Sequence, residues 1–378
     1  MNDKMKIWVS FFLGLGLLAS CSNDKYPLPI VPDSDSDYSN VGKEVYNLVY
    51  PIMDSENGYH FSHPADIYFG VDNFIYICDT DNDRIVMMDA GGAIQGYSQT
   101  IEHPEAITQN DSLALLIVNK TNQIFKIDLF KANHIIAGAE VKVVYTQVSE
   151  PTREFTGITI HKGFEYYVTV VDVADSSDNY TEFNFIYDFN AKNTLKGTLP
   201  LFINGTGLYS TLLPTSIVSI RERYLDISSK SEDLPDFWFT QTGRTKMLSN
   251  SFKIQSVTSY LFEGQYNIRA NTGLIGSDIY DSERYWNPED IALDHQGYIF
   301  VVDAGRDTAD ADTTRPAPGF YRFSSAGTML QSVIGLGAGD RSFNHPKGIA
   351  VSPNLEEQTV YIADTGNNRI VMFKLSTQ

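Results

Sequence analysis

The chain has 378 residues and a net charge of −19, because 47 Asp and Glu outnumber 28 Lys and Arg. Such an acidic surface repels a phosphate backbone, so we expect no nucleic-acid partner. Its two cysteines, Cys21 and Cys78, are too few for a framework of disulfides. Cys78 lies in an apolar run, and we expect it to be a small buried hydrophobic side chain.

The N-terminus has the pattern of a targeting segment. Lys4 and Lys6 precede an apolar run over residues 8–18, which is too short to span a bilayer. The run ends at residues 18–21, Leu-Ala-Ser-Cys, which resemble the lipobox of bacterial lipoproteins. That resemblance implies a signal peptide over residues 1–20, cleavage before Cys21, and acylation of its thiol. An ordinary secretory signal and a buried core strand are the alternatives.

Residues 21–42 are rich in Ser, Asp and Pro and cannot bury enough apolar surface to fold. They predict a flexible spacer behind the anchor, which several acyl chains such as palmitate would hold stably in a membrane. The acidic, Lys-containing stretch after Cys21 resembles the surface-export signal of Bacteroidota lipoproteins. Ser22 rather than an Asp follows the cysteine, and in the lipoproteins that this chain resembles this indicates that the protein is not retained at the inner membrane. We therefore expect a lipid-anchored protein of the cell outer membrane, exposed at the surface.

From residue 43 onward the chain repeats one pattern. An apolar strand that usually begins with Pro is followed by a turn, a second β-rich strand, a turn rich in Asp, Asn and Gly, and often a third strand. Self-similar units of this length are typical of four-stranded propeller blades. The leading residues of the six repeats are Pro64, Pro104, Phe155, Pro214, Pro288 and Pro346. The first two lie 40 residues apart, whereas the third and fourth repeats contain long insertions.

Two of the turns are almost identical. Residues 364–369 are Asp-Thr-Gly-Asn-Asn-Arg, and residues 79–84 are Asp-Thr-Asp-Asn-Asp-Arg. With the strands before them they resemble NHL repeats, and this resemblance implies an all-β, six-bladed β-propeller over residues 43–378. The last repeat supplies only three strands, so we expect the β-rich residues 45–50 to pair as the outermost strand of blade six. Such closure removes an exposed sheet edge.

Charged residues gather where the innermost strands begin. The residue after each leading Pro should lie near the channel mouth, and the next residue just inside it. The predicted ligand-binding residues are Glu105, Glu289, Asp290, Lys347 and Asp66. A carboxylate cluster at the mouth would resemble the cation site of gluconolactonase-type propellers, although the residue set of those enzymes does not align here. The alternative is a solvated polar entrance.

Two further motifs invite a metal interpretation. His63, His103 and His345 precede the leading Pro in three blades, and three histidines around a ring suggest zinc. In the zinc-binding, NHL-type peptidyl-amidoglycolate lyase, ligand histidines follow the Pro instead, so here we expect turn histidines between blades. Calcium at Asp79, Asp81, Asp83 and Asp364 is less favoured than turn hydrogen bonds braced by Arg84 and Arg369. We therefore predict neither a metal site nor a cofactor.

Aromatic residues crowd two segments. Tyr180, Phe183, Phe185 and Tyr187 lie in the insertion of blade three, and Tyr280, Tyr285 and Trp286 precede blade five. Exposed rings of this kind stack on sugars, while buried ones pack between blades. We favour packing for most of them.

No catalytic residues are predicted, because no nucleophile–base pair or phosphate loop is present in the motifs. The favoured function is a non-catalytic binding or scaffold module, whose ligand is a glycan or a peptide. Lipoproteins of this kind often accompany outer-membrane importers of the SusC/SusD type, so a transporter is a further candidate partner. The alternative is a metal-dependent lyase or lactonase with its site at the channel mouth.

Overall fold

The computed structural model describes residues 44–174, 184–201, 211–220, 236–242, 252–263, 265–307, 309, 312–353 and 358–377. Cys21, the predicted signal peptide and the predicted spacer lie outside these residues. Residues Glu44–Ser376 form one compact unit. Within the described residues, no helix combines the length and the apolar character needed to cross a membrane.

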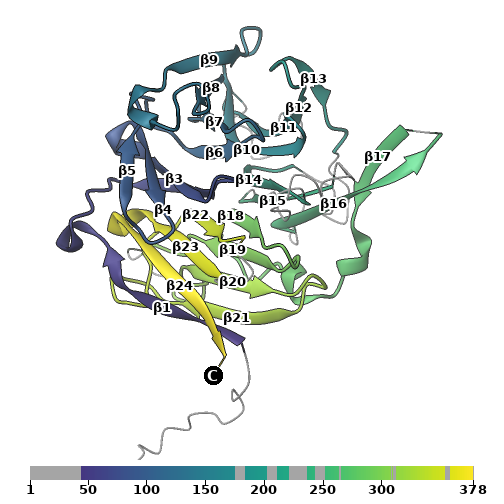
Figure 1. The fold of residues 1–378 in the computed structure, drawn as a ribbon. Helices are drawn as coiled ribbons and strands as arrows, with labels where there is room; N and C mark the ends of the chain where they lie inside the picture. The colour runs from purple at the N-terminus through teal and green to yellow at the C-terminus, as the bar shows by residue number, and fades with distance from the viewer. Residues whose placement is uncertain are drawn as a thin grey trace, which may run out of the picture. The chain divides into compact units, whose positions relative to one another are not determined.

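The described residues form six four-stranded antiparallel sheets, which are the six blades of a β-propeller (Figure 1). Blade one contains β2 (Pro64–Phe69), β3 (Phe74–Asp79), β4 (Arg84–Asp89) and β5 (Ile94–Tyr97). Blade two contains β6 (Ala106–Gln109), β7 (Ala114–Val118), β8 (Gln123–Asp128) and β9 (Val141–Thr146). Blade three contains β10 (Arg153–Lys162), β11 (Glu165–Asp172), β12 (Phe185–Phe189) and β13 (Leu195–Thr198).

The second half of the ring repeats this order. Blade four contains β14 (Pro214–Ser219), β15 (Phe237–Gln241), β16 (Ile254–Phe262) and β17 (Gln265–Ala270). Blade five contains β18 (Pro288–Leu293), β19 (Ile299–Asp303), β20 (Gly319–Phe323) and β21 (Met329–Ile334). Blade six contains β22 (Gly348–Val351), β23 (Thr359–Asp364), β24 (Arg369–Thr377) and β1 (Glu44–Met53). Short 3₁₀ turns connect some strands: η2 (Ser55–Asn57), η3 (Thr80–Asn82), η4 (Ile136–Gly138), η7 (Thr272–Leu274), η8 (Asp278–Tyr280) and η9 (Thr365–Asn367).

Blade six confirms the predicted closure. The N-terminal strand β1 lies beside the C-terminal strand β24, and the order in this sheet is β1-β24-β23-β22. In Figure 1 the purple strand β1 runs along the yellow strand β24. The Tyr46 side chain of β1 is 1% exposed and meets the ring of Phe300 in blade five edge-on, with 5.6 Å between ring centroids. The closing strand is therefore packed into the core as well as hydrogen-bonded to the sheet.

Burial within the blades is greatest in the second strands and least in the outermost strands. Every residue of the second strands β7, β19 and β23 is buried, because neighbouring blades cover both faces of these strands. Outermost strands such as β13 are largely exposed. Cys78 on β3 is fully buried, as predicted. The core thus lies between blades, and each blade is stabilised mainly by its neighbours.

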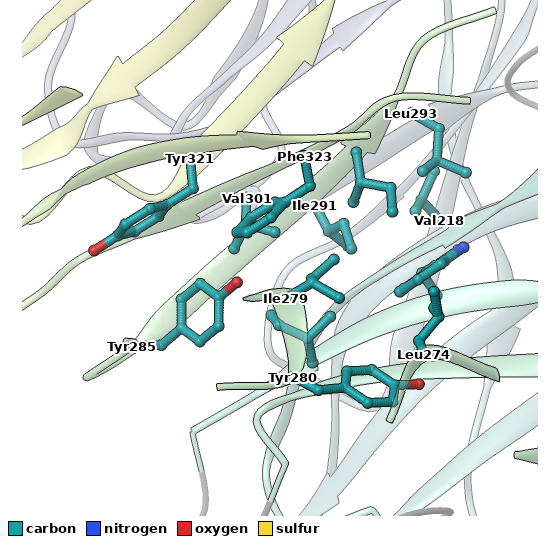
Figure 2. Packing of buried hydrophobic residues seen from close by; sticks show 13 residues of the cluster. Val218, Leu274, Ile279, Tyr280, Tyr285, Ile291, Leu293, Val301, Tyr321 and Phe323 are labelled. Atoms are coloured by element: carbon teal, nitrogen blue, oxygen red, sulfur yellow. The ribbon is translucent and has the colours of Figure 1, made fainter. Parts of the chain in front are cut away.

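One of these interblade cores joins blades four and five (Figure 2). Val218 of β14 packs there with Ile291 and Val301 of blade five. Tyr280 and Tyr285, two of the aromatic residues ahead of blade five, belong to the same cluster and are buried. This confirms packing rather than surface exposure for these two rings.

The Asp-rich turns are braced as predicted. Arg84 donates from Nε to Asp79 Oδ2 at 2.8 Å, and Arg369 makes the equivalent bond to Asp364 at 2.7 Å. The other oxygen of Asp79 accepts the backbone N–H of Ser62 at 2.7 Å. These buried carboxylates are therefore saturated by the loops that they hold together.

Candidate functional site

The innermost strands close a ring, since each of β2, β6, β10, β14, β18 and β22 contacts the next and β22 contacts β2. All begin at the same face, where the Pro-led turns enter them. Glu105, Glu289, Asp290, Lys347 and Asp66 therefore come from four blades but line a single cavity at this mouth. The cavity measures about 20 Å³, which is room for roughly one water molecule. The structure thus brings all five predicted residues together, around very little free space.

A pair of lysines holds Glu105. Lys347 of blade six donates from Nζ to Glu105 Oε1 at 3.2 Å, and Lys120 of blade two bonds the same oxygen. The Glu105 side chain is only 12% exposed. Burial by itself raises the pKa of the Glu105 carboxyl, but the two ammonium groups outweigh burial and keep this pKa below its usual value. Glu105 is therefore an ionised carboxylate whose Oε1 is held by both lysines.

Glu289 is the exception at the mouth. Burial raises the pKa of its carboxyl, and the Lys347 ammonium only partly opposes that rise. Among the described residues, no hydrogen bond or ion pair reaches the Glu289 carboxyl group. Burial by itself lowers the pKa of the Lys347 ammonium, but the carboxylates of Glu105 and Glu289 outweigh burial and raise this pKa above its usual value. Glu289 is thus the mouth residue best able to accept a bond from a ligand.

Asp290 and Asp66 connect neighbouring blades. Asp290 accepts the backbone N–H of Ile291 and that of Ile349 in blade six, both at 2.7 Å, and it also accepts the Ser216 hydroxyl of blade four. Asp66 accepts the N–H of Ile67 at 2.7 Å and that of Ile107 in blade two at 2.8 Å. The oxygens of both carboxylates are directed at backbone amides. Their evident role is to join innermost strands.

The channel behind this mouth is narrow. It is lined by one isoleucine from each blade, always three positions after the leading residue: Ile67, Ile107, Ile158, Ile217, Ile291 and Ile349. All six side chains are buried. The space left between the innermost strands is about 70 Å³. Small-molecule sites occupy roughly 300–1,000 Å³, so the channel is too narrow to hold such a ligand.

The three turn histidines lie at junctions between blades. His63, His103 and His345 all have positive φ angles, of 46°, 42° and 49°. The backbone N–H of His103 is bonded by Asp83 of the preceding blade, and that of His63 by Asn368. The His63 and His103 rings lie near Asp81, whereas His345 pairs with Asp307.

A different group contains the ligand types that a metal prefers. His161, Glu165 and Asp188 of blade three each offer one ligand atom, and these atoms lie within 4.8 Å of one another; in the described part of the chain this is the one such group of three or more. His161 is stacked on Tyr167 and bonds Asp188 at 3.0 Å. However, the Lys196 ammonium lies 2.7 Å from Asp188 and 3.0 Å from Glu165. Lys196 thus already supplies the positive charge that a metal ion would bring to these two carboxylates.

Sequence reasoning missed this blade-three group. Its members come from three strands with no shared motif, and only the pairing of β11 with β10 and β12 brings them together. His161 precedes a turn without a leading Pro, so the repeat pattern does not single it out.

Of the remaining candidate aromatics, Tyr180 and Phe183 lie outside the described residues. Tyr187 is buried, and the Arg153 guanidinium lies 4.6 Å above the ring of Phe185. The Trp286 ring has the Arg315 guanidinium 4.2 Å from its centroid. These described rings already have protein partners.

Comparisons with known proteins reveal the fold alone. No family model and no curated protein matches the chain. Among solved structures, a gluconolactonase from Xanthomonas campestris has a TM-score of 0.53 at 10% identity, covering 89% of this chain and 98% of its own. A calcium-binding regucalcin from Agrobacterium tumefaciens has a TM-score of 0.55 at 10% identity, and the match covers 88% of this chain and 96% of the regucalcin. A protein of unknown function from Bacteroides thetaiotaomicron has a TM-score of 0.55 at 12% identity, and the match covers 88% of this chain and 77% of that protein.

Proposed function

We propose that this chain is a non-catalytic binding module of the NHL-like propeller type, anchored by lipid at the outer membrane. Its ligand is a glycan or a peptide held on the outside of the propeller, and an importer of the SusC/SusD type is its candidate partner. One observation carries the proposal: the protein's own charges occupy the mouth of the channel, and the channel behind it leaves only about 70 Å³ of free space.

The charges at the mouth are committed to structure. Asp66 and Asp290 accept backbone N–H groups, and Glu105 is held by two lysines. A metal-dependent enzyme needs several carboxylates or histidines that converge on one point with a position left open for substrate. In the described residues, no mouth side chain belongs to such a group. The geometry therefore supports binding or scaffolding over catalysis.

The anchor rests on the sequence. Residues 18–21 resemble a lipobox, and an acylated Cys21 followed by a flexible spacer would leave the propeller free to meet partners at the membrane surface. The Bacteroidota-like character and the surface exposure are parts of the same proposal.

One observation favours the alternative, a lactonase or lyase. Glu289 is a carboxyl of raised pKa at the mouth, with no bond to a described residue, and such a group can act as a general acid or base. Known propellers with this general fold include the gluconolactonase named above.

Two assays test the proposal. Cys21→Ala should move the full-length protein from detergent-extracted membranes to the soluble fraction, and a variant that stays in the membrane contradicts lipid anchoring. The parent should not hydrolyse gluconolactone with added Ca²⁺, Zn²⁺ or Mn²⁺. Turnover by the parent that disappears in Glu289→Gln would overturn the non-catalytic assignment in favour of the alternative.

A further inference from the structure

A second cavity lies at the opposite face, on the outer part of blade two. β8 runs away from the mouth, since β6, β7 and β8 are successive antiparallel strands, so its last residue Asp128 lies at the far end. The cavity has a volume of about 400 Å³, within the range of roughly 300–1,000 Å³ that small-molecule sites occupy. Its charged and amide side chains are Lys126, Lys131, Lys142, Asp128, Glu140 and Asn193.

Two of the lysines form a like-charge pair. Lys126 of β8 and Lys142 of β9 are directly opposite each other in the register, so their side chains share one face of the sheet. Like charges in that arrangement destabilise a sheet unless an anion lies between them. Lys126 makes no ion pair with any described residue. In a chain with a net charge of −19, this cavity has three lysines against two acids, and that excess of positive charge favours an anion.

The acids of the cavity restrict what the anion is. Lys131 pairs with Asp128 at 3.0 Å and Lys142 with Glu140 at 2.9 Å. These pairs are solvent-exposed and contribute little, so a ligand can replace them. An anion bound to the lysines would leave the two carboxylates in need of hydrogen-bond donors. Inorganic phosphate near neutral pH supplies at most about two O–H donors, whereas a polyhydroxylated ligand supplies several.

Asn193, on the turn between β12 and β13 of blade three, completes the polar lining. Its Oδ1 accepts the Tyr166 hydroxyl at 3.2 Å, which fixes the orientation of the amide. The amide Nδ2 donates no hydrogen bond to a described residue. It is therefore free to bond a ligand oxygen.

We propose that this cavity binds a sugar acid, with its carboxylate between Lys126 and Lys142 and its hydroxyls on Asp128, Glu140 and Asn193. The remaining lining residues Ala132, Gly138, Ala139 and Val144 are small, and no aromatic ring is among them. This inference rests on the proposed function, in which a glycan is a candidate ligand, and it narrows that ligand to an acidic one.

Calorimetric titration of the full-length protein with galacturonate tests the site, beside methyl galactoside and inorganic phosphate. Galacturonate should bind more tightly than either. Lys126→Gln and Lys142→Gln should each weaken its binding by at least about tenfold. Lys192→Gln is the control, because it makes the same change of charge on the neighbouring turn but outside the cavity. This variant should bind galacturonate as tightly as the parent does. Because Lys126→Gln relieves repulsion, its thermal stability without ligand should not fall, which separates lost binding from misfolding.

Three results would overturn the inference: no galacturonate binding, equal binding by Lys126→Gln and the parent, or phosphate bound as tightly as galacturonate. Glu105→Gln/Glu289→Gln at the mouth should not affect binding. If this double variant loses galacturonate binding while the lysine variants keep it, the site lies at the mouth and the proposed binding function still holds. If the parent instead turns galacturonate over, the non-catalytic function is contradicted, although the location of the site is not.

Discussion

The carboxylate of Asp290 accepts the backbone N–H of Ile349 at 2.7 Å, although the two residues lie on the innermost strands of different blades. Its other oxygen accepts the N–H of Ile291, the next residue in its own strand. One side chain thereby joins blade five to blade six, and Asp66 joins blade one to blade two in the same way. A residue chosen from the sequence as a ligand contact is thus part of the scaffold.

Asp290→Asn should destabilise the fold. An amide has a single acceptor oxygen, so one of the two backbone N–H groups would face an NH₂ group instead. A buried donor left unsatisfied costs about 1–3 kcal/mol, and we expect that loss in the free energy of unfolding by denaturant. Glu56→Gln, a similar change at an exposed position, serves as the control. Equal stability of the two variants would contradict the interblade role.

The same residue predicts a dependence of stability on pH. Burial raises the pKa of the Asp290 carboxyl to about 7, against an ordinary value of roughly 3.9 in the unfolded chain. Between these values the folded state holds a proton that the unfolded state has lost, so stability falls as the pH rises through this window. The parent should therefore exceed Asp290→Asn in unfolding free energy by more at pH 4 than at pH 8. A constant difference would show that Asp290 does not titrate there.

Closure of the ring should depend on Tyr46. Its buried ring packs against Phe300, and its backbone N–H and carbonyl both bond the Gln331 side chain of blade five. Truncating a buried aromatic side chain costs about 3–5 kcal/mol, so Tyr46→Ala should markedly lower the temperature of thermal unfolding. Tyr50→Ala on the same strand, where the side chain is 63% exposed, should change it little. Similar melting of both variants would mean that β1 contributes little to the core.

Removing Lys196 should create a metal site in blade three. In Lys196→Ala the carboxylates of Glu165 and Asp188 lose their ammonium partner, while Tyr167 still holds the His161 ring in place by stacking. Zn²⁺ takes His nitrogen and carboxylate oxygen as ligands, so equilibrium dialysis should show tighter zinc binding by this variant than by the parent. Lys196→Ala/His161→Phe is the matched control and should lose that gain. Equal zinc binding by the parent and Lys196→Ala would exclude competition by the lysine.

The sequence alone determined the blade count, the order of strands and the closure by residues 45–50. These features follow from local signals: the period of the repeat, the apolar strand after each leading Pro, and the turn residues that permit left-handed backbone. Each signal lies within one blade, so one blade can be interpreted without knowing its neighbours. The same symmetry placed Glu105, Glu289 and Lys347 at a common mouth before any contact was known.

Only the tertiary structure decided what those residues do. Lys347 and Glu105 are 242 positions apart, and no local pattern predicts that they pair. Gly348 shows the reason in its simplest form: a Cβ there would lie 2.7 Å from the Cα of Asp66, at the junction where the last blade meets the first. Interactions between blades depend on distances across the ring, which the repeat period does not encode. The occupied mouth, the narrow channel and the cavity of blade two are all set by such distances.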